Sequence, residues 1–130
     1  MIQQETKECI TAAIFAESQR AERLHGKFHS SHEGYAVLLE EIEEAQEILE
    51  KIKEDASILW DVIRQDGNGM ELAFSIYLRA IDCCGEMVQI GAVAGKYCRS
   101  MQKQKDPEEP EEFSENERML MARFLGRSYT

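Results

Sequence analysis

Apolar side chains recur at helical spacing along this chain, and proline, which interrupts helices, occurs only at Pro107 and Pro110. In the central stretch, residues 31–54, apolar residues fall every three or four positions, which places them on one side of a helix. No stretch alternates polar with apolar residues in the way that a half-buried strand requires. The pattern therefore predicts an all-α fold.

Local signals set the expected ends of the helices. Gly26 ends the first helix, and the turn sequence DGNG at residues 66–69 separates the second helix from the third. The second helix begins with the S-x-x-E pattern of residues 30–33, a capping box whose side chains satisfy backbone donors. We expect helices over residues 3–24, 31–54, 70–102 and 114–125, with the second running on or bending through residues 58–63.

These elements predict an antiparallel helical bundle of three to four main helices. A chain of 130 residues with 43% apolar residues has room for one domain. We assign residues 1–105 to an all-α domain and residues 106–130 to an acidic linker with a short C-terminal helix. Because three long helices leave a bundle incomplete, we expect a homo-oligomer, either a dimer or a tetramer.

The net charge of −10 is concentrated near the C-terminus. Residues 106–117 hold seven of the 25 acidic residues and no basic residue, which leaves 18 acids against 15 bases elsewhere. Binding of duplex DNA or RNA needs clustered Lys and Arg, so this composition disfavours such a partner. A small anion is still compatible with a local basic site.

Neither a membrane segment nor a disulfide framework is expected. The chain has no run of 18 apolar residues, and its first ten residues lack the basic-then-apolar order of a secretory signal. Its four cysteines form no CxxC pair, and Cys83 and Cys84 are adjacent, which is unfavourable for an ordinary disulfide. We therefore expect a cytoplasmic protein with reduced thiols.

Glu41 lies inside the apolar face of the second predicted helix. With Leu38 at the centre of a helical wheel, Glu41 falls at about 60° and Glu44 at about 120° on the same side. The expected core residues of this face are Tyr35, Leu38, Ile42, Ala45, Leu49 and Ile52. Burying an unpaired carboxylate is unfavourable or forces a proton onto it, so Glu41 needs a partner. A divalent metal ion or a salt bridge to a Lys or Arg of another helix would satisfy this requirement.

The third predicted helix carries a narrow polar stripe. Between residues 80 and 98 its strongly polar residues fall within about 80° of one another; they are Asp82, Glu86, Gln89 and Lys96. The stripe either faces solvent on a mostly buried helix or faces Glu41 and Glu44 across a cleft. Glycines and alanines on the same segment favour close approach of the backbone to a neighbouring helix or to a ligand.

The glutamate-rich part of the second helix resembles a known motif. Residues 40–44, EEIEE, resemble the EExxE motif of the all-α nucleoside triphosphate pyrophosphohydrolases, the superfamily of MazG and the dimeric dUTPases. The wider stretch HSSHEGYAVLLEE, residues 29–41, is similar to phage and bacterial MazG-like proteins, and the resemblance extends over residues 28–97. The family's second motif, ExxD, corresponds to Glu86-Met87-Val88-Gln89, in which Gln89 replaces the aspartate.

The resemblance implies a Mg-dependent enzyme that cleaves a nucleoside or deoxynucleoside triphosphate between its α and β phosphates, releasing a monophosphate and pyrophosphate. It assigns Mg²⁺, or Mn²⁺ in its place, to Glu41, Glu44 and Glu86. Asp82, one turn before Glu86, and Gln89 are further candidate ligands, although an amide binds a hard cation less well than a carboxylate. The resemblance therefore predicts a metal site between the second and third helices.

The same resemblance implies residues that act on the nucleotide. Glu41 and Glu44 are the expected catalytic carboxylates, and Lys96 is expected to contact a phosphate. Lys27 and Arg99 are further candidates for phosphate contacts. Contacts to the base would come from the first helix and from a partner subunit.

Two other classes of protein stay open. A catalytically silent helical interaction protein would keep the fold while its acids form ordinary ion pairs, and Gln89 favours this alternative. A di-iron four-helix protein is the other alternative, because Glu22-Arg23-Leu24-His25 has the E-x-x-H spacing of such sites. That spacing occurs once here, whereas the usual di-iron site needs two copies.

Overall fold

The computed structural model describes residues 1–102 and 114–124. Its helices are α1 (Gln4–His25), α2 (Ser31–Arg64), α3 (Met70–Met101) and α4 (Glu115–Phe124). No strand occurs in the described ranges, and the three long helices pack together, so the predicted all-α bundle is confirmed. The expected boundary between residues 105 and 106 lies outside the described residues.

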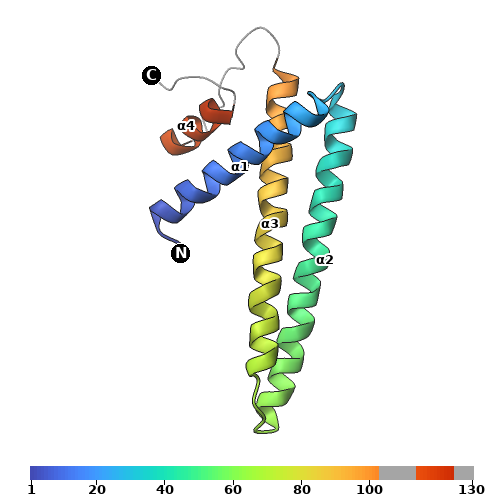
Figure 1. Cartoon of the computed structure of the whole chain (residues 1–130), viewed down its shortest axis with the longest axis vertical. Helices are drawn as coiled ribbons and strands as arrows, with labels where there is room; N and C mark the ends of the chain where they lie inside the picture. Colours follow the sequence, from blue (N-terminus) through green and yellow to red (C-terminus); the bar gives the residue numbers. More distant parts are fainter. Residues whose placement is uncertain (103–113, 125–130) are drawn as a thin grey trace.

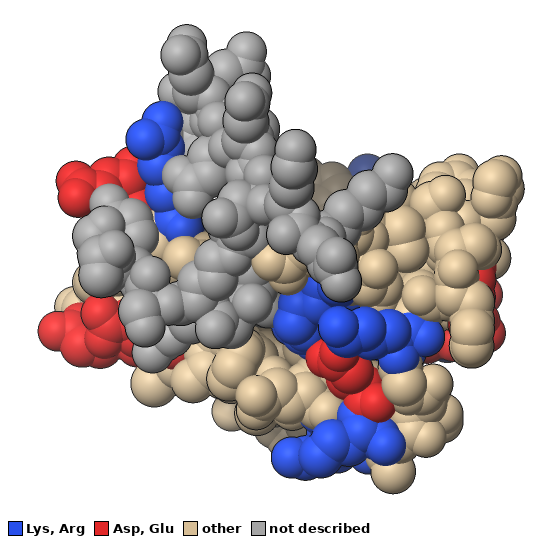
Figure 2. Space-filling model, turned by 90° about the horizontal axis from the view of Figure 1, so that it is seen from above, with Lys and Arg blue, Asp and Glu red and all other residues tan. Residues whose placement is uncertain are grey.

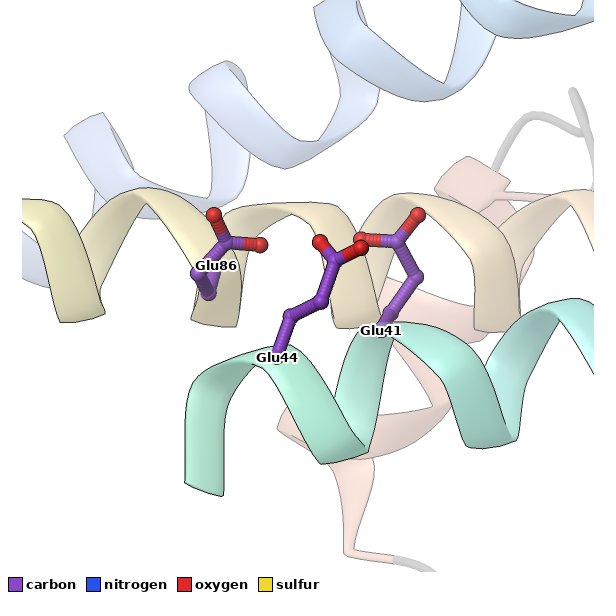
Figure 3. Close-up of side chains that lie close together, drawn as sticks. All are labelled: Glu41, Glu44 and Glu86. Atoms are coloured by element: carbon purple, nitrogen blue, oxygen red, sulfur yellow. The ribbon is translucent and has the colours of Figure 1, made fainter. Parts of the chain in front are cut away.

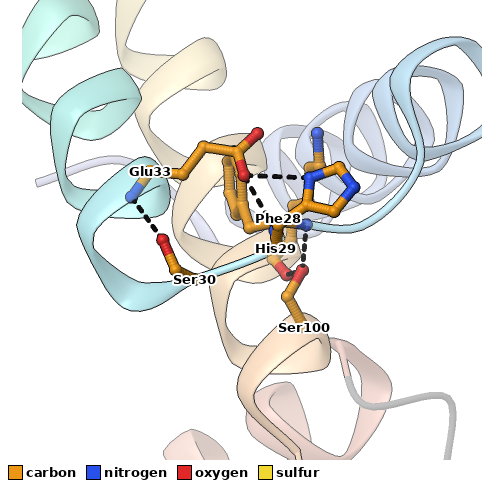
Figure 4. Close-up of polar contacts among 6 residues, drawn as sticks. Phe28, His29, Ser30, Glu33 and Ser100 are labelled. Atoms are coloured by element: carbon orange, nitrogen blue, oxygen red, sulfur yellow. Dashed lines mark hydrogen bonds and ion pairs between the residues drawn. The ribbon is translucent and has the colours of Figure 1, made fainter.

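The junction between α1 and α2 forms at the predicted signals. Gly26 has φ 70°, a conformation that favours glycine, and its N–H donates to the Glu22 carbonyl at 2.8 Å. Ser30 Oγ accepts a hydrogen bond from the Glu33 N–H at 3.1 Å and so caps α2 (Figure 4). The Glu33 carboxylate accepts from the His29 N–H at 2.8 Å, one residue before the donor of a standard capping box.

Helix α2 continues without interruption to Arg64, which settles the open question of whether it bends near residue 58. The predicted turn follows it, with Asp66 at φ 54° and the Gly67 N–H donating to the Val62 carbonyl at 2.9 Å. The Met70 N–H at the start of α3 donates to Asn68 Oδ1 at 3.0 Å. The two long helices therefore form an antiparallel hairpin, which extends well beyond α1 (Figure 1).

The hairpin is held by a seam with the spacing of a coiled coil. On α2, one row of buried and half-buried positions recurs at alternating steps of four and three; it consists of Gly34, Leu38, Glu41, Ala45, Ile48, Ile52, Asp55, Leu59 and Val62. A row on α3 follows the same steps; it consists of Leu72, Ile76, Arg79, Cys83, Glu86, Ile90, Val93 and Tyr97. Contacts such as Cys83 Sγ with the Ala45 carbonyl at 4.0 Å join the two sets. The repeat of seven residues keeps one row of each helix against the other.

Three residues of α2 that the sequence placed in the core are exposed. Tyr35, Ile42 and Leu49 keep 63%, 41% and 42% of their surface accessible, whereas Ala45 keeps 3%. The expectation was wrong for these three because α1 packs on α3 rather than on α2. The apolar side of α2 is therefore wider than the surface that α3 buries, and part of it stays exposed.

Helix α1 crosses α3 at close range (Figure 1). Ser18 is fully buried, and its hydroxyl donates to the Ala92 carbonyl at 2.9 Å. A Cβ placed on Gly91 would lie 2.9 Å from Ile14 Cδ1, so this glycine lets the two helices approach. At Gly91, the close approach that the sequence predicted is thus to a neighbouring helix.

The surface mixes charges of both signs. Figure 2 shows Lys and Arg side chains lying next to Asp and Glu side chains at the end of the molecule where α1 meets the hairpin. Exposed ion pairs one turn apart, such as Lys53 with Glu50 at 3.2 Å, occur along the helices. Among the described helices, none is long and apolar enough to cross a membrane.

Candidate metal centre

Two polar layers interrupt the otherwise apolar seam between α2 and α3. In the layer nearer the turn, Arg79 Nε lies 2.9 Å from Asp55 Oδ2. The Ser75 hydroxyl donates to the same carboxylate at 2.8 Å. This layer is electrically balanced, because one base faces one acid and a hydroxyl supplies a further hydrogen bond.

The second polar layer contains only acids. Glu41 and Glu44 project from consecutive turns of α2, and Glu86 projects from α3 toward them (Figure 3). One carboxylate oxygen of each residue lies within 4.8 Å of the others. Glu41 and Glu86 are half-buried and Glu44 is exposed, so the cluster opens to solvent on the Glu44 side. The predicted convergence of these three residues is thus present in the structure.

Burial and the crowding of like charges raise the pKa values of two of these acids. Partial burial, followed by the negative charges of Glu44 and Glu86, raises the pKa of Glu41 above its ordinary value of 4.5. The pKa of Glu44 is also raised, through desolvation, the charge of Glu86, that of Glu40 and a hydrogen bond with Glu86. Both carboxyls therefore keep their protons to a higher pH than an ordinary glutamate does.

No basic side chain neutralises this layer within the described ranges. Neither Glu41, Glu44 nor Glu86 forms an ion pair with a described Lys, Arg or His. The salt-bridge explanation for the position of Glu41 therefore does not hold within residues 1–102 and 114–124.

The anchoring of the α1–α2 junction fixes where these glutamates fall. The Phe28 ring is buried, and the Phe28 N–H donates to Ser100 Oγ at 2.8 Å (Figure 4). Ser100 in turn donates to the Lys96 carbonyl at 2.8 Å. Because the start of α2 is tied to the end of α3, Glu41 and Glu86 are held at matching heights along the seam.

Two further candidate ligands lie elsewhere. Asp82 is exposed and is not a member of the cluster. Gln89 donates from its Nε2 to Glu17 Oε1 of α1 at 3.1 Å, so its amide supports the α1–α3 contact. Hydrogen bonds from Arg20 and then Gln89 lower the pKa of Glu17. The acid expected at position 89 has no counterpart in the cluster, which contains three carboxylates.

The predicted phosphate-binding cations also lie apart from the acids. Lys96 is buried, with its Nζ 4.2 Å from the centroid of the Phe28 ring, a cation–π contact. It is ten residues from Glu86, or about 15 Å along α3. Arg99 Nε lies 2.8 Å from Glu22 Oε2 and its guanidinium donates to Ser18, so it links α1 to α3. Lys27 is exposed near the junction.

The di-iron alternative loses its main ligand in this arrangement. Glu22, the acid of the E-x-x-H sequence, is paired with Arg99, and His25 is exposed at the end of α1. Neither residue belongs to the acidic cluster. Glu22 instead forms an ion pair with Arg99 that joins α1 to α3.

An open cleft lies between α1 and α4, away from the acids. Its lining includes Lys7 and Thr11 of α1 and Asn116 and Leu120 of α4. None of the three clustered glutamates lines it. The cleft and the acidic layer are therefore separate features of the described structure.

Sequence reasoning missed the balanced layer, the buried Ser18 and the half-buried Ser100. Asp55 and Arg79 fall on seam positions, so heptad spacing would have found them once α2 was taken through to Arg64. Ser18 and Ser100 carry no such signal, because a short hydroxyl residue is equally common on an exposed helix surface. Their roles follow from the crossing of α1 over α3.

No family model, no curated protein and no solved structure matches the chain significantly. The resemblance to MazG-like proteins therefore stays a prediction that rests on the residues of α2 and α3.

Proposed function

We propose that the protein is a Mg-dependent nucleoside triphosphate pyrophosphohydrolase, which converts a (d)NTP to a (d)NMP and pyrophosphate. The observation that carries the proposal is the layer of Glu41, Glu44 and Glu86, which lie within 4.8 Å of one another in a helical seam. The same seam neutralises its other polar layer with Arg79. An acidic layer with no described base fits a role in holding a cation.

The donor set suits Mg²⁺ or Mn²⁺. Both ions prefer oxygen ligands, and Mg²⁺ keeps several waters or phosphate oxygens in its shell. Three carboxylates with one exposed side would leave coordination positions for water and substrate. The raised pKa values of Glu41 and Glu44 also mean that a cation would displace protons from groups that hold them more readily than an ordinary glutamate.

A bound divalent ion would neutralise phosphate charge and lower the pKa of a coordinated water. Glu41 and Glu86, fixed by the seam, would orient that ion and the phosphates in line with the attacking water. Glu44, the exposed member of the cluster, would accept the proton of the water. The water oxygen would bond to the α phosphorus as the bond from that phosphorus to the bridging oxygen breaks, and the bridging oxygen would leave with the electron pair in pyrophosphate.

Other parts of the proposal follow from this activity. Nucleoside triphosphates are cytoplasmic metabolites, so we place the protein in the cytoplasm. Lys96 contacts the Phe28 ring and would have to leave it to bind a phosphate. It also lies about 15 Å along α3 from Glu86. The expected role of Lys96 is therefore the part of the proposal that the geometry supports least.

A catalytically silent interaction protein is the competing function. The contact of Gln89 with Glu17 favours it, because the position of the family's fourth acid is used for helix packing. Such a protein would keep the acidic layer without turnover. The two functions differ in whether the layer acts on a nucleotide.

Pyrophosphate release separates these functions. Each NTP and dNTP is incubated with the full chain and Mg²⁺ or Mn²⁺, and pyrophosphate and orthophosphate are measured separately. We expect pyrophosphate release that falls at least about 100-fold in Glu41→Gln, the usual scale for loss of a catalytic group. Glu43→Gln, which removes an exposed acid of the same helix outside the cluster, is the matched control. Absence of turnover with every nucleotide, or full activity of Glu41→Gln, would refute the enzymatic function.

A further inference from the structure

Lys96 is a buried cation for which no ion pair accounts. Its side chain is 7% exposed. Within the described residues no carboxylate pairs with it, and no acceptor forms a hydrogen bond with its ammonium. The ammonium instead lies 4.2 Å from the centroid of the Phe28 ring. Burying an ammonium is unfavourable, and an apolar side chain would fill the same space without that cost. The position of Lys96 therefore calls for a role beyond packing.

The Phe28 ring joins the start of α2 to the last turns of α3. The Phe28 N–H donates to Ser100 Oγ, and Ser100 donates to the Lys96 carbonyl, so backbone and ring of Phe28 are held by the same turn of α3 (Figure 4). Gly34 of α2 packs on the ring from the other helix, since a Cβ placed there would lie 3.2 Å from Phe28 Cδ2. The first turn of α2 is thus seated on α3 through Phe28.

The charge of Lys96 also acts on the cap of α2. Hydrogen bonds from the His29 N–H and ring, and then the positive charges of His29 and Lys96, outweigh desolvation and lower the pKa of Glu33. The Glu33 N–H donates to Ser30 Oγ, so the same residue completes the first turn of α2. Both effects of Lys96, on the Phe28 ring and on Glu33, therefore fall at the start of α2.

The acidic layer lies between two anchors of the seam. On α2, Phe28 lies 13 residues before Glu41, and Asp55, the acid of the balanced layer, lies 14 residues after it. Apolar layers of a heptad seam resemble one another and permit one helix to slide along the other, whereas a polar contact within the seam specifies the register. The carboxylates of the acidic layer repel one another, which favours any slide that separates Glu41 from Glu86. The two anchors hold α2 against that slide.

We propose that Lys96 is a positioning residue for the metal site: by holding the Phe28 ring it fixes the start of α2 on α3, and so keeps Glu41 and Glu44 opposite Glu86. The role rests on the metal site of the proposed function and on no step of its reaction. Unlike a contact with phosphate, it needs no departure of Lys96 from the ring. Lys96 would act before any nucleotide binds.

The test measures Mn²⁺ binding to the full chain without nucleotide, by the electron paramagnetic resonance of the free ion. Lys96→Met should bind Mn²⁺ about tenfold more weakly than the wild type, the usual scale for loss of a group that orients a ligand. Removal of a positive charge alone would strengthen the binding of a cation, so a weaker affinity has the opposite sign to a direct effect of charge. Lys96→Arg, which keeps a cation for the ring, should restore the wild-type affinity.

Lys51→Met is the matched control. Lys51 is exposed and lies ten residues from Glu41, as Lys96 lies ten residues from Glu86, so the same charge is lost at a similar separation from the acids. Its affinity for Mn²⁺ should not fall. Unchanged affinity of Lys96→Met overturns the positioning role. If that variant instead raises only the KM for a nucleotide, Lys96 contacts a phosphate, and the role is overturned as well.

Amide hydrogen exchange in EDTA tests the anchor without a metal, and decides on Lys96 if the wild type binds no Mn²⁺ and the metal site fails. Residues 34–44 should exchange at least about fivefold faster in Lys96→Met than in the wild type, and residues 56–64, beyond Asp55, at the same rate. Equal exchange over residues 34–44 overturns the positioning role. If Lys96→Met does not fold, by circular dichroism, Phe28→Leu removes the ring, keeps an apolar side chain at the site and carries the same expectations.

Discussion

Glu41 of α2 and Glu86 of α3 meet in one layer of the seam, with carboxylate oxygens within 4.8 Å of each other. Two heptads further along α2, Asp55 meets Arg79 at 2.9 Å. The same pair of helices thus holds one layer of like charge and one balanced layer. Removing a charge should have opposite effects on stability in the two layers, because it relieves repulsion in the first and leaves an unpaired ion in the second.

Glu41→Gln should stabilise the metal-free protein at neutral pH. The substitution removes one of three crowded charges while keeping the shape of the side chain, and the expected gain is about 0.5 kcal/mol. Thermal unfolding in the presence of EDTA measures it as a rise in Tm of about 2 °C. Glu43→Gln, in the same helix and outside the cluster, should leave Tm unchanged. A Tm of Glu41→Gln below that of the wild type would mean that Glu41 has a stabilising partner.

The metal-free protein should lose stability as pH rises from about 4.5 toward neutrality, through the acidic layer. The pKa of Glu41 is raised above 4.5 in the folded chain, so the folded state binds more protons than the unfolded state across this interval. The free energy of unfolding therefore falls with rising pH as the group ionises. Urea unfolding at several pH values gives the free energy of unfolding of the wild type and of Glu41→Gln. The difference between the two free energies isolates the contribution of Glu41, because the acids outside the cluster contribute equally to both proteins. A difference that is independent of pH would contradict the raised pKa.

Arg79→Met should destabilise the protein by about 2 kcal/mol, because it leaves the Asp55 carboxylate without its base in the seam. Arg64→Met provides the comparison, since Arg64 pairs with Asp61 one turn away on an exposed surface. Loss of that pair should cost no more than about 0.5 kcal/mol. Urea unfolding of both variants gives the two free energies. Equal losses would mean that the Asp55–Arg79 layer contributes no more than a surface pair.

Gly91→Ala should destabilise the protein by about 1 to 3 kcal/mol, the general cost of overpacking. The new Cβ would lie 2.9 Å from Ile14 Cδ1 and 3.0 Å from its Cγ2, so α1 must shift. Gly85→Ala on the same helix meets nothing within 4 Å and should stabilise by up to about 1 kcal/mol through helix propensity. Thermal unfolding of the two variants gives opposite shifts in Tm. A stabilising Gly91→Ala would refute the close crossing of α1 over α3.

The sequence predicted the helices well because their signals are local. The glycine at the end of α1, the serine cap of α2 and the Asp-Gly turn each act within a few residues, and all three are found where expected. The start of α4 is similar, since the Ser114 N–H donates to Glu117 and Ser114 Oγ accepts from the Glu117 N–H. Each such element depends on neighbours in the sequence and on no distant contact.

The packing of the helices could be predicted only in part. The wheel separated Glu41 and Glu44 from the solvated glutamates, and the structure brings both to Glu86. It could not show which helix α1 contacts, so Ile42 was placed in the core although it is exposed. Gln89 was assigned to the acidic side for the same reason, whereas the crossing of α1 takes it to Glu17. Contacts between distant segments decide these positions.

Direct binding of Mn²⁺ to the full chain, followed by the electron paramagnetic resonance of the free ion, tests the metal site itself. We predict saturable binding to the wild type, unchanged in Glu43→Gln and at least about tenfold weaker in Glu86→Gln, with Mg²⁺ competing for the site. Circular dichroism confirms that each variant is folded. No binding to the wild type at millimolar Mn²⁺, or equal binding to Glu86→Gln, would contradict a metal centre formed by Glu41, Glu44 and Glu86.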